Sequence, residues 1–405
     1  MSSASASVNK NVVIIGGGII GVCTAYYLAK EGGFHVTIVE NGVIAGGASG
    51  KAGGFLAEDW HSSATSSLGY LSYSLHKELA EAYGGEQRWQ YRGVQSSNVL
   101  LKATTSTSDS QPAANVVHDG EEEFRPRPPP VGESNIDWIS KPLQDARGVI
   151  SHELVSDESS TAQVEPYLFT CSILHEAKQL GVQVVHAEVD AFSNGSVKLS
   201  TGDTLEADSL ILAAGPWTDH VFTKLFPNTH THLPVQALPG YSLILQPQST
   251  PSAHAAFTTI LGYDTATAGM SGTPELFSRT DGTVYVAGEN DGPDLPPSAA
   301  QVAVVAQTQQ HRWDMLSAAV HELGPSLAGA SVVKKQLCYR PITPRKRPIV
   351  SSLKSLVGED VFVACGHGPW GISLAPGTGK VMAELVSRGE AVSADISKLS
   401  IDEFV

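Results

Sequence analysis

The first clear pattern of apolar positions is a short continuous run near the start of the chain, followed by glycines and then by a longer apolar segment. Val12–Ile15 are all β-branched, which is typical of a strand buried on both faces of a parallel sheet. Residues 22–30 then predict a helix, and residues 35–40 predict a second strand. Together these elements predict a βαβ unit of about 30 residues.

The turn between the first strand and the helix carries Gly16, Gly18 and Gly21 in the spacing G-x-G-x-x-G. The first glycine permits a tight turn, the second lets backbone amides approach a diphosphate, and the third lets the helix pack closely. Ile19 and Ile20 lie in the same turn, where the positive end of the helix favours an anion. We therefore predict that an adenine dinucleotide binds here; a glycine-rich turn without a ligand is the alternative.

The second predicted strand ends at Glu40, which follows Gly21 after a further 19 positions. A carboxylate at this place accepts hydrogen bonds from the hydroxyl groups of a ribose. Asn41 follows directly, and we include it in the predicted binding site.

The middle of the chain alternates helical and strand patterns. Residues 68–83 place leucines at helical spacing, which predicts a helix with a core-facing stripe. Residues 167–180 predict a second helix, which Gly181 ends. The strands predicted in this part of the chain are 91–95, 98–101, 183–186, 189–192 and 209–213.

From residue 233 to about 334 the pattern changes to short alternating strands at 242–245, 276–279 and 283–288, with a long helix at 299–319. Residues 337–341, a strand at 361–364 and a helix at 375–387 then return to the elements of a dinucleotide-binding domain. We therefore predict an α/β fold with an interleaved α+β substrate domain that contains a mainly antiparallel sheet. The Rossmann-like domain comprises residues 8–60, 150–232 and 333–405, and the substrate domain comprises residues 61–149 and 233–332.

Residues 103–135 differ from the rest in composition. They contain a Thr/Ser run, three successive glutamates and a proline run at 128–130. Because little of this segment can be buried, we predict a mobile surface insertion. An extended peptide-recognition segment is the alternative.

Charge and cysteine content narrow the class of protein. The 405 residues include 26 Lys and Arg against 41 Asp and Glu, a net charge of −15, which argues against a nucleic-acid or anionic-membrane surface. The 4 cysteines show no C-x-x-C spacing, which favours reduced thiols over disulfides and over a metal site. Since no secretory, peroxisomal or transmembrane signal is recognisable, we expect a cytoplasmic protein without a transmembrane segment.

Three later segments bring small residues together. Residues 45–56 form a loop whose amides and Ser49 hydroxyl are possible donors, although a flexible linker would have a similar composition. Residues 213–217 end a predicted strand, and residues 366–372 form a glycine-rich loop before a helix.

In this order, the first glycine turn, the segment 48–54, Ala213-Ala214-Gly215-Pro216-Trp217, Tyr339-Arg340-Pro341 and the loop 366–372 resemble the FAD-dependent D-amino acid oxidase superfamily. That superfamily includes glycine oxidase and monomeric sarcosine oxidase. The resemblance covers nearly the whole chain apart from 103–135. Within the superfamily, residues 49–55 resemble most a poorly characterised eukaryotic branch of oxidoreductases, which gives no substrate.

The resemblance implies bound FAD, whose extended shape and large ring need contacts from several distant segments. Some sarcosine oxidases bind the flavin covalently through a cysteine, but here Leu337 occupies that position and Cys338 is one position later. We therefore predict noncovalent FAD. The implied contacts beyond the βαβ unit are Ser49, Gly50, Lys51, Ala52, Gly53, Gly54, Val189, Ala214, Gly215, Trp217, Gly366, His367, Gly368, Pro369, Trp370, Gly371 and Ile372.

The resemblance also implies catalytic candidates. Arg340 would bind a substrate carboxylate through its planar guanidinium group, although a solvated basic turn is the alternative because Arg345 and Lys346 follow. His367 would donate to the flavin or tune its potential, or else only pack beside Trp370. Tyr241 would bind a carboxylate.

The predicted reaction is hydride transfer from the α-carbon of a carboxylated primary or secondary amine to flavin N5, with O₂ or another compound as the acceptor. No position matches the lysine that activates oxygen in sarcosine oxidases. A 2-hydroxy acid as substrate and a flavoprotein with a mainly trafficking or partner-binding role are the alternatives.

Overall fold

The computed structural model describes residues 9–102, 128–136, 138–139, 149–261, 273–323 and 325–405. Most of the predicted insertion at 103–135 therefore lies outside the described residues. The part that is described does not behave as a loose loop: β6 (Gly132–Glu133) pairs with β7 (Val149–Ser156). Ser134 is buried, and its hydroxyl lies 2.6 Å from that of Ser97.

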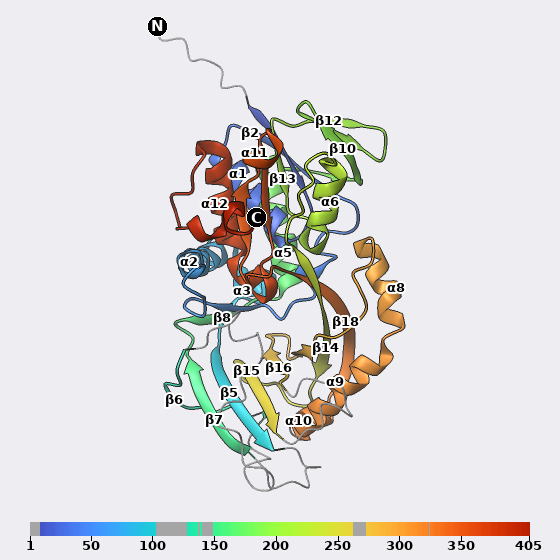
Figure 1. Ribbon diagram of the computed structural model, residues 1–405. Helices are drawn as coiled ribbons and strands as arrows, with labels where there is room; N and C mark the ends of the chain where they lie inside the picture. The colour runs from blue at the N-terminus through green and yellow to red at the C-terminus, as the bar shows by residue number, and fades with distance from the viewer. Residues whose placement is uncertain (1–8, 103–127, 137, 140–148, 262–272, 324) are drawn as a thin grey trace.

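The first half of the fold is a six-stranded sheet, which lies in the upper part of Figure 1. Its order is β19-β20-β13-β1-β2-β9, and all pairs are parallel except β19 with β20. The strands are β1 (Lys10–Ile15), β2 (Phe34–Glu40), β9 (Gln183–His186), β13 (Ser209–Leu212), β19 (Ile349–Ser352) and β20 (Val361–Cys365). This is the Rossmann-like sheet that the sequence predicts.

Helices cover both faces of this sheet because successive strand residues point to opposite sides. Val12 and Ile14 pack with α1 (Ile19–Glu31) and α12 (Gly371–Arg388) on one face. Val13 and Ile15 pack on the other face, in a cluster that includes Phe222 of α6 (Thr218–Leu225).

The second half is an eight-stranded sheet in the order β18-β14-β17-β16-β15-β5-β7-β6 (Figure 1). All neighbours are antiparallel except β15 and β5. The strands not yet given are β5 (Gln95–Lys102), β14 (Gln236–Gln246), β15 (His254–Leu261), β16 (Glu275–Ser278), β17 (Val284–Glu289) and β18 (Ser331–Ile342). The mainly antiparallel sheet of the predicted fold is thereby confirmed.

The two faces of the eight-stranded sheet have different neighbours. Leu276 and Val286 pack into a cluster with Trp313 of α9 (Gln310–Glu322). Phe277 and Tyr285, one position away in each strand, join the core that contains α1 and α12. One face of the large sheet is therefore turned toward the six-stranded half of the molecule.

The remaining elements connect these two halves or cap them. A small sheet joins β3 (Phe55–Ala57), β8 (Thr161–Gln163) and β4 (Arg92–Gly93), and another joins β10 (Val189–Ser193), β11 (Ser196–Leu199) and β12 (Thr204–Glu206). The other helices are α2 (Ser66–Tyr83), α3 (Gly85–Trp89), α5 (Pro166–Gln179), α8 (Val302–Gln307), α10 (Pro325–Ala328) and α11 (Lys354–Val357), with short 3₁₀ turns η1 (Ala48–Gly50), η2 (Gly215–Trp217), η3 (Ala299–Gln301), η4 (Gly368–Trp370), η5 (Ser397–Leu399) and η6 (Ile401–Glu403).

The long helix predicted at 299–319 is wrong as a single element. It divides into η3, α8 and α9, with a break at Thr308 and Gln309. The Thr308 amide and hydroxyl both donate to Val305 O, at 3.1 and 2.8 Å, and the Gln309 amide donates to Ala306 O. These i→i−3 bonds tighten the turn and stop the α-helical ladder.

Two strands lie across the predicted domain boundaries at 150 and 333. Both β7 and β18 belong to the eight-stranded sheet, although the boundaries would place most of each strand in the Rossmann-like domain. The reason is pairing with distant strands: β18 is hydrogen-bonded to β14 from Gln236–Ile342 to Gln246–Ser331. The division into domains otherwise stays a prediction.

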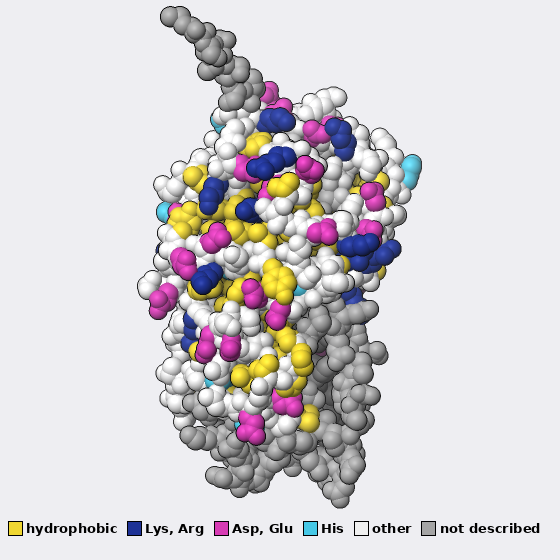
Figure 2. Space-filling model, turned by 90° about the vertical axis from the view of Figure 1, so that its left-hand side faces the viewer, with side chains coloured by type: hydrophobic (Ala, Val, Ile, Leu, Met, Phe, Trp, Pro, Cys, Tyr) yellow, Lys and Arg dark blue, Asp and Glu magenta, His cyan; other side chains and the backbone are white. Residues whose placement is uncertain are grey.

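Figure 2 shows Lys and Arg side chains interspersed with Asp and Glu side chains over the six-stranded half of one face. In the described ranges, no helix is both long and apolar enough to span a bilayer.

Candidate active site

A cavity of about 460 Å³ is lined by residues of both large sheets. One group of lining residues comes from β1, α1 and β2, and another comes from β14, β16, β17 and β18. The predicted cofactor contacts that line it are Gly16, Gly18, Ile19, Ile20, Glu40, Asn41, Ser49, Ala52, Gly53, Gly54, Val189, Ala214, Gly215, Trp217, His367, Gly368, Pro369, Trp370, Gly371 and Ile372. Segments separated by more than 300 positions in the sequence thus meet at one cavity.

Four predicted contacts do not line the cavity. A Cβ on Gly21 would lie 2.1 Å from Gly16 O, and one on Gly50 would lie 2.3 Å from Ala45 O, so both glycines permit close backbone packing. Gly366 has a φ of +79° and serves the turn before η4. Lys51 is partly buried, and this burial lowers the pKa of its ammonium group.

The turn after β1 brings its backbone against the neighbouring strand. Gly16 has a φ of +114°, and a Cβ there would lie 2.3 Å from Ala213 O. A side chain at this position would therefore push β1 and β13 apart. The turn also leads into α1, whose first residues Ile19 and Ile20 line the cavity, and the N-terminus of a helix can bind a diphosphate.

Glu40 is held by two backbone amides. Gly17 N donates to one carboxylate oxygen and Gly42 N to the other, each at 2.7 Å. Each oxygen retains capacity for a further bond, so the carboxylate is oriented and can still accept from a ribose diol. Ser49 Oγ accepts from Ile19 N at 2.9 Å, which leaves its own hydroxyl hydrogen to donate at the start of α1.

The loop 366–372 enters α12 directly, and Gly371 and Ile372 both line the cavity. Pro376 lies inside this helix and has no N–H for the carbonyl of Ile372. His76 Nε2 of α2 lies 2.9 Å from that carbonyl and serves as its donor. A side chain of α2 thus supplies the missing hydrogen-bond donor for a carbonyl in the first turn of α12, next to the cavity.

Ser72 supports the same turn. Its hydroxyl donates to Ser373 O at 2.6 Å and accepts from Gly377 N at 3.0 Å, so it is inserted where a direct i→i−4 bond would otherwise form. Ser72 and His76 are both fully buried.

His367 lies in the cavity lining, and its Nε2 is 3.1 Å from Thr378 Oγ1. Burial lowers its pKa to about 3, so the ring is neutral at physiological pH. Nδ1 is buried and has no hydrogen-bond partner among the described residues. This nitrogen is therefore a candidate contact for a bound cofactor, as the sequence predicts for His367.

Arg340 lies on the cavity side of β18 and its Nη2 donates to Asn290 Oδ1. Asn290 also lines the cavity. The Nε of Arg340 is buried without a partner among the described side chains and backbone groups. This guanidinium is oriented by one amide and still has donors for a carboxylate.

Tyr241 lines the cavity, but its side chain also belongs to the core beside α9. In β18, Leu337 and Tyr339 belong to that core, and Tyr241 pairs with Leu337. Its ring packs edge-on against Trp313 at 5.4 Å, and its hydroxyl lies 3.4 Å from Gln309 Oε1. Directly paired residues share a face, so the side chains of Tyr241 and Arg340 leave their strands on opposite faces of the sheet. The role of Tyr241 in binding a substrate carboxylate stays a prediction.

Sequence reasoning missed several residues that line the cavity, among them Glu275, Phe277, Tyr285, Asn290 and Cys338. The alternation in the predicted strands 276–279 and 283–288 was a usable signal, because it places Phe277 and Tyr285 on one face. Asn290 follows a predicted strand end, and nothing in its local sequence marks it.

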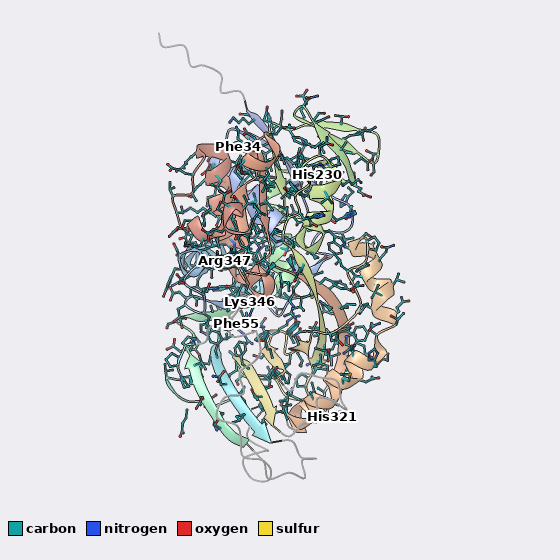
Figure 3. The ribbon with its side chains drawn as sticks, viewed as in Figure 1. Phe34, Phe55, His230, His321, Lys346 and Arg347 are labelled. Atoms are coloured by element: carbon teal, nitrogen blue, oxygen red, sulfur yellow. The ribbon has the colours of Figure 1, made fainter. Side chains whose placement is uncertain are left out.

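Aromatic rings form one wall of the cavity. The ring of Phe277 stacks on the rings of Phe55 and Tyr285, with centroids 5.7 and 5.8 Å apart. The ring centroid of Trp370 lies 6.5 Å from that of Phe55. Figure 3 shows Phe55 at the junction of the two halves of the molecule. A Cβ on Gly53 would lie 2.3 Å from the ring of Phe277, so the small residues before Phe55 are needed for this wall.

These residues fit FAD. The cavity connects helix amides and an oriented carboxylate, which suit the diphosphate and ribose, with an aromatic wall and a glycine loop, which suit a flat ring. The Nδ1 atom of His367, which is buried without a hydrogen-bond partner among the described residues, is a candidate for a further contact. Over the described part of the chain, no cluster of His, Cys, Asp or Glu is arranged to hold a metal ion.

Comparisons with known proteins agree with this geometry. Residues 11–385 match the family model described as FAD dependent oxidoreductase (DAO). A Schizosaccharomyces pombe protein named as an oxidoreductase, C1F5.03c, is 30% identical over 96% of this chain and 97% of its own length.

Two solved structures share the fold. L-proline dehydrogenase from P. horikoshii superposes with a TM-score of 0.71 at 19% identity, covering 98% of each chain. Glycine oxidase from Geobacillus kaustophilus superposes with a TM-score of 0.65 at 21% identity, covering 96% of this chain and 98% of that one. The match over residues 11–385, on a fold whose cavity suits FAD, shows that this chain belongs to the DAO family of FAD-dependent oxidoreductases.

Proposed function

We propose that this protein oxidises a small primary or secondary amine that carries a carboxylate, with noncovalently bound FAD. The observation that carries the proposal is Arg340, which faces the cavity beside Asn290. Two fold relatives are named for their action on proline and on glycine, and both compounds are carboxylated amines.

Arg340 binds the substrate carboxylate in this proposal. A guanidinium group offers parallel N–H donors that match the two oxygens of a carboxylate. Because β18 contacts η4, a substrate held at Arg340 lies near the loop 366–372 that would carry the flavin ring. The arginine thereby aligns the α-carbon for reaction.

The chain's own groups tune the site. The amides at the start of α12 favour negative charge where the reduced ring would carry it. His367 remains neutral, so it adds a hydrogen-bonding nitrogen without a positive charge. Phe55, Phe277 and Trp370 exclude water from the wall of the cavity.

When bound, FAD accepts the hydride that leaves the α-carbon. Hydride loss requires a neutral amine, and the resulting imine hydrolyses in water after release. The amine therefore gives its ammonium proton to solvent before it binds, and in this neutral form it needs no acid–base pair from the protein. The protein supplies alignment and charge stabilisation.

Cys338 supports noncovalent binding. It faces the cavity two positions before Arg340, and burial raises the pKa of its thiol. Since the thiolate is the nucleophile, a neutral thiol disfavours attachment to the flavin. Acid precipitation of the holoenzyme should release all FAD into the supernatant; yellow colour retained in the protein pellet would contradict this part of the proposal.

An anaerobic screen tests the main proposal. The purified holoenzyme is mixed with amino acids, N-methyl amino acids and 2-hydroxy acids, and the visible flavin band is followed. Bleaching by a carboxylated amine is expected. Bleaching by 2-hydroxy acids alone would show that the hydride donor is a 2-hydroxy acid and not an amine. Arg340 is compatible with both, because it recognises only the carboxylate. No bleaching by any compound would favour a role in partner binding or trafficking. Admitting air to the reduced enzyme then shows whether O₂ is the acceptor.

A further inference from the structure

A fully buried threonine of α12, Thr378, contacts the histidine that lines the cavity. We propose that Thr378 is a positioning residue, whose hydroxyl donates to Nε2 of His367 and thereby makes Nδ1 of the same ring a hydrogen-bond donor to the bound FAD. Thr378 does not itself line the cavity, so it acts through His367. The inference concerns the cofactor and does not depend on which substrate the protein oxidises.

The hydroxyl of Thr378 differs from those of two other buried helical threonines. Thr24 of α1 and Thr170 of α5 each donate to the carbonyl four residues earlier, at 2.8 Å. Thr378 Oγ1 instead lies 3.1 Å from His367 Nε2, and this is the one hydrogen bond of the hydroxyl within the described part of the chain. Because a buried hydroxyl hydrogen is costly to leave without an acceptor, we assign Nε2 as its acceptor.

The role of Nε2 decides the role of Nδ1. Burial lowers the pKa of His367 to about 3, so the ring is neutral at physiological pH and carries one proton. Since Nε2 accepts from Thr378, that proton is on Nδ1. The orientation of one hydroxyl thus fixes the tautomer of the ring beside the cavity.

Two other buried histidines, His61 and His76, have the opposite tautomer. Their Nε2 atoms lie 3.0 and 2.9 Å from the carbonyls of Ala57 and Ile372. A carbonyl can only accept, so Nε2 carries the proton in both rings. Neither ring lines the cavity.

The Nδ1–H group of His367 points to a ligand. Nδ1 is buried and has no partner among the described residues, and buried donors are rarely left unpaired in folded proteins. Because the ring lines the cavity, a group bound there can supply the acceptor.

Close helix packing fixes the position of Thr378. A Cβ on Gly377 would lie 2.9 Å from Ser72 Cβ of α2, and one on Gly379 would lie 2.5 Å from the backbone of Cys23 in α1. On either side of Thr378, α12 therefore lies directly against a neighbouring helix. Such packing leaves the helix little freedom to turn the hydroxyl away from His367.

A donor at Nδ1 affects the reduction potential of the cofactor. The acceptor atoms of a flavin ring are more electron-rich in the reduced form, so a donor beside them stabilises that form. A hydrogen bond into Nε2 also polarises the ring and makes Nδ1–H a stronger donor. Loss of the Thr378 hydroxyl should therefore lower the reduction potential.

The first test measures the reduction potential of the holoenzyme by dye equilibration during anaerobic reduction. Thr378→Val keeps the shape of the side chain without the hydroxyl. It should shift the equilibrium toward oxidised FAD about fivefold, which is a fall of about 20 mV for two electrons. Thr378→Ser retains the hydroxyl and should restore most of the potential.

Thr170→Val is the matched control, because it removes an equally buried hydroxyl whose hydrogen bond lies within its own helix. It should leave the potential unchanged. A potential in Thr378→Val equal to that of the wild type would overturn the inference.

The second test reads the tautomer in the wild-type holoenzyme and needs no folded variant of Thr378. Protonated and unprotonated nitrogens of a neutral imidazole ring are well separated in nitrogen NMR spectra of protein with isotope-labelled histidine. His367, identified by the loss of its signals in His367→Asn, should show a protonated Nδ1, whereas His61 and His76 should show a protonated Nε2. A protonated Nε2 in His367 would overturn the inference, and the role proposed for Arg340 would be unaffected.

Discussion

Arg340 Nη2 donates a hydrogen bond to the side-chain oxygen of Asn290, although the two residues are 50 positions apart. Asn290 follows β17, and the residues directly before and after it form ion pairs with α9. Arg312 pairs with Glu289 at 3.2 Å and with Asp291 at 2.5 Å. The group that orients the guanidinium is therefore fixed by a helix on the far side of the large sheet.

Arg340→Ala should raise KM for the carboxylated substrate by about 100-fold, because a charge-assisted pair with a carboxylate contributes about 1.5–3 kcal/mol. The FAD content should not change. Steady-state kinetics and the visible spectrum of the purified variant measure both quantities. Arg345→Ala, in the exposed turn nearby, is the control, and normal kinetics in Arg340→Ala would refute the assignment.

Asn290→Ala should raise KM by about fivefold with a smaller effect on kcat, because the arginine loses one orienting bond of about 1 kcal/mol. Asn290→Ser keeps a neutral acceptor oxygen and should restore part of the affinity. If alanine and serine behave alike, Asn290 does not act through its acceptor.

His76→Leu should lower the free energy of unfolding by about 1–3 kcal/mol, because it leaves the carbonyl of Ile372 buried without a donor. FAD affinity should also fall, since this carbonyl lies in the first turn of α12. Urea denaturation with and without added FAD measures both effects. His175→Ala on the exposed side of α5 is the control, and His76→Gln should recover part of the loss because it retains a donor.

Three buried histidines should make the fold sensitive to acid. Burial lowers the pKa of His61 and His76 to about 4 and that of His367 to about 3, whereas an unfolded histidine has a pKa near 6.5. Since the folded pKa is lowered, the stabilisation is complete above pH 6.5 and is lost as the pH falls toward 4.

In that window the unfolded chain binds up to three more protons, so the unfolding free energy should fall by as much as about 4 kcal/mol per pH unit. Urea titrations at pH 7.5, 6 and 5 test this dependence. In His76→Gln the unfolding free energy should depend less steeply on pH, by the contribution of about one proton. If the pH dependence equals that of the wild type, His76 does not contribute to the acid sensitivity.

Local sequence determined the elements that bind the dinucleotide. The β-branched run, the glycine spacing and Glu40 lie within about 30 residues, so short-range sterics and periodicity suffice to predict β1, α1 and β2. The arginine motif and the loop 366–372 were also recognisable, because each is a short segment whose residue types are tied to one chemical task.

Only the tertiary structure decided which side chains share the cavity. Tyr241 and Arg340 lie in paired strands, yet register turns their side chains to opposite faces. Asn290, directly after β17, and Glu275 of β16 also line the cavity. The sequence likewise did not predict the break at Thr308 or the membership of β18 in the large sheet. A period of two residues predicts that a strand exists, but its partner and register depend on contacts between segments that are far apart in the chain.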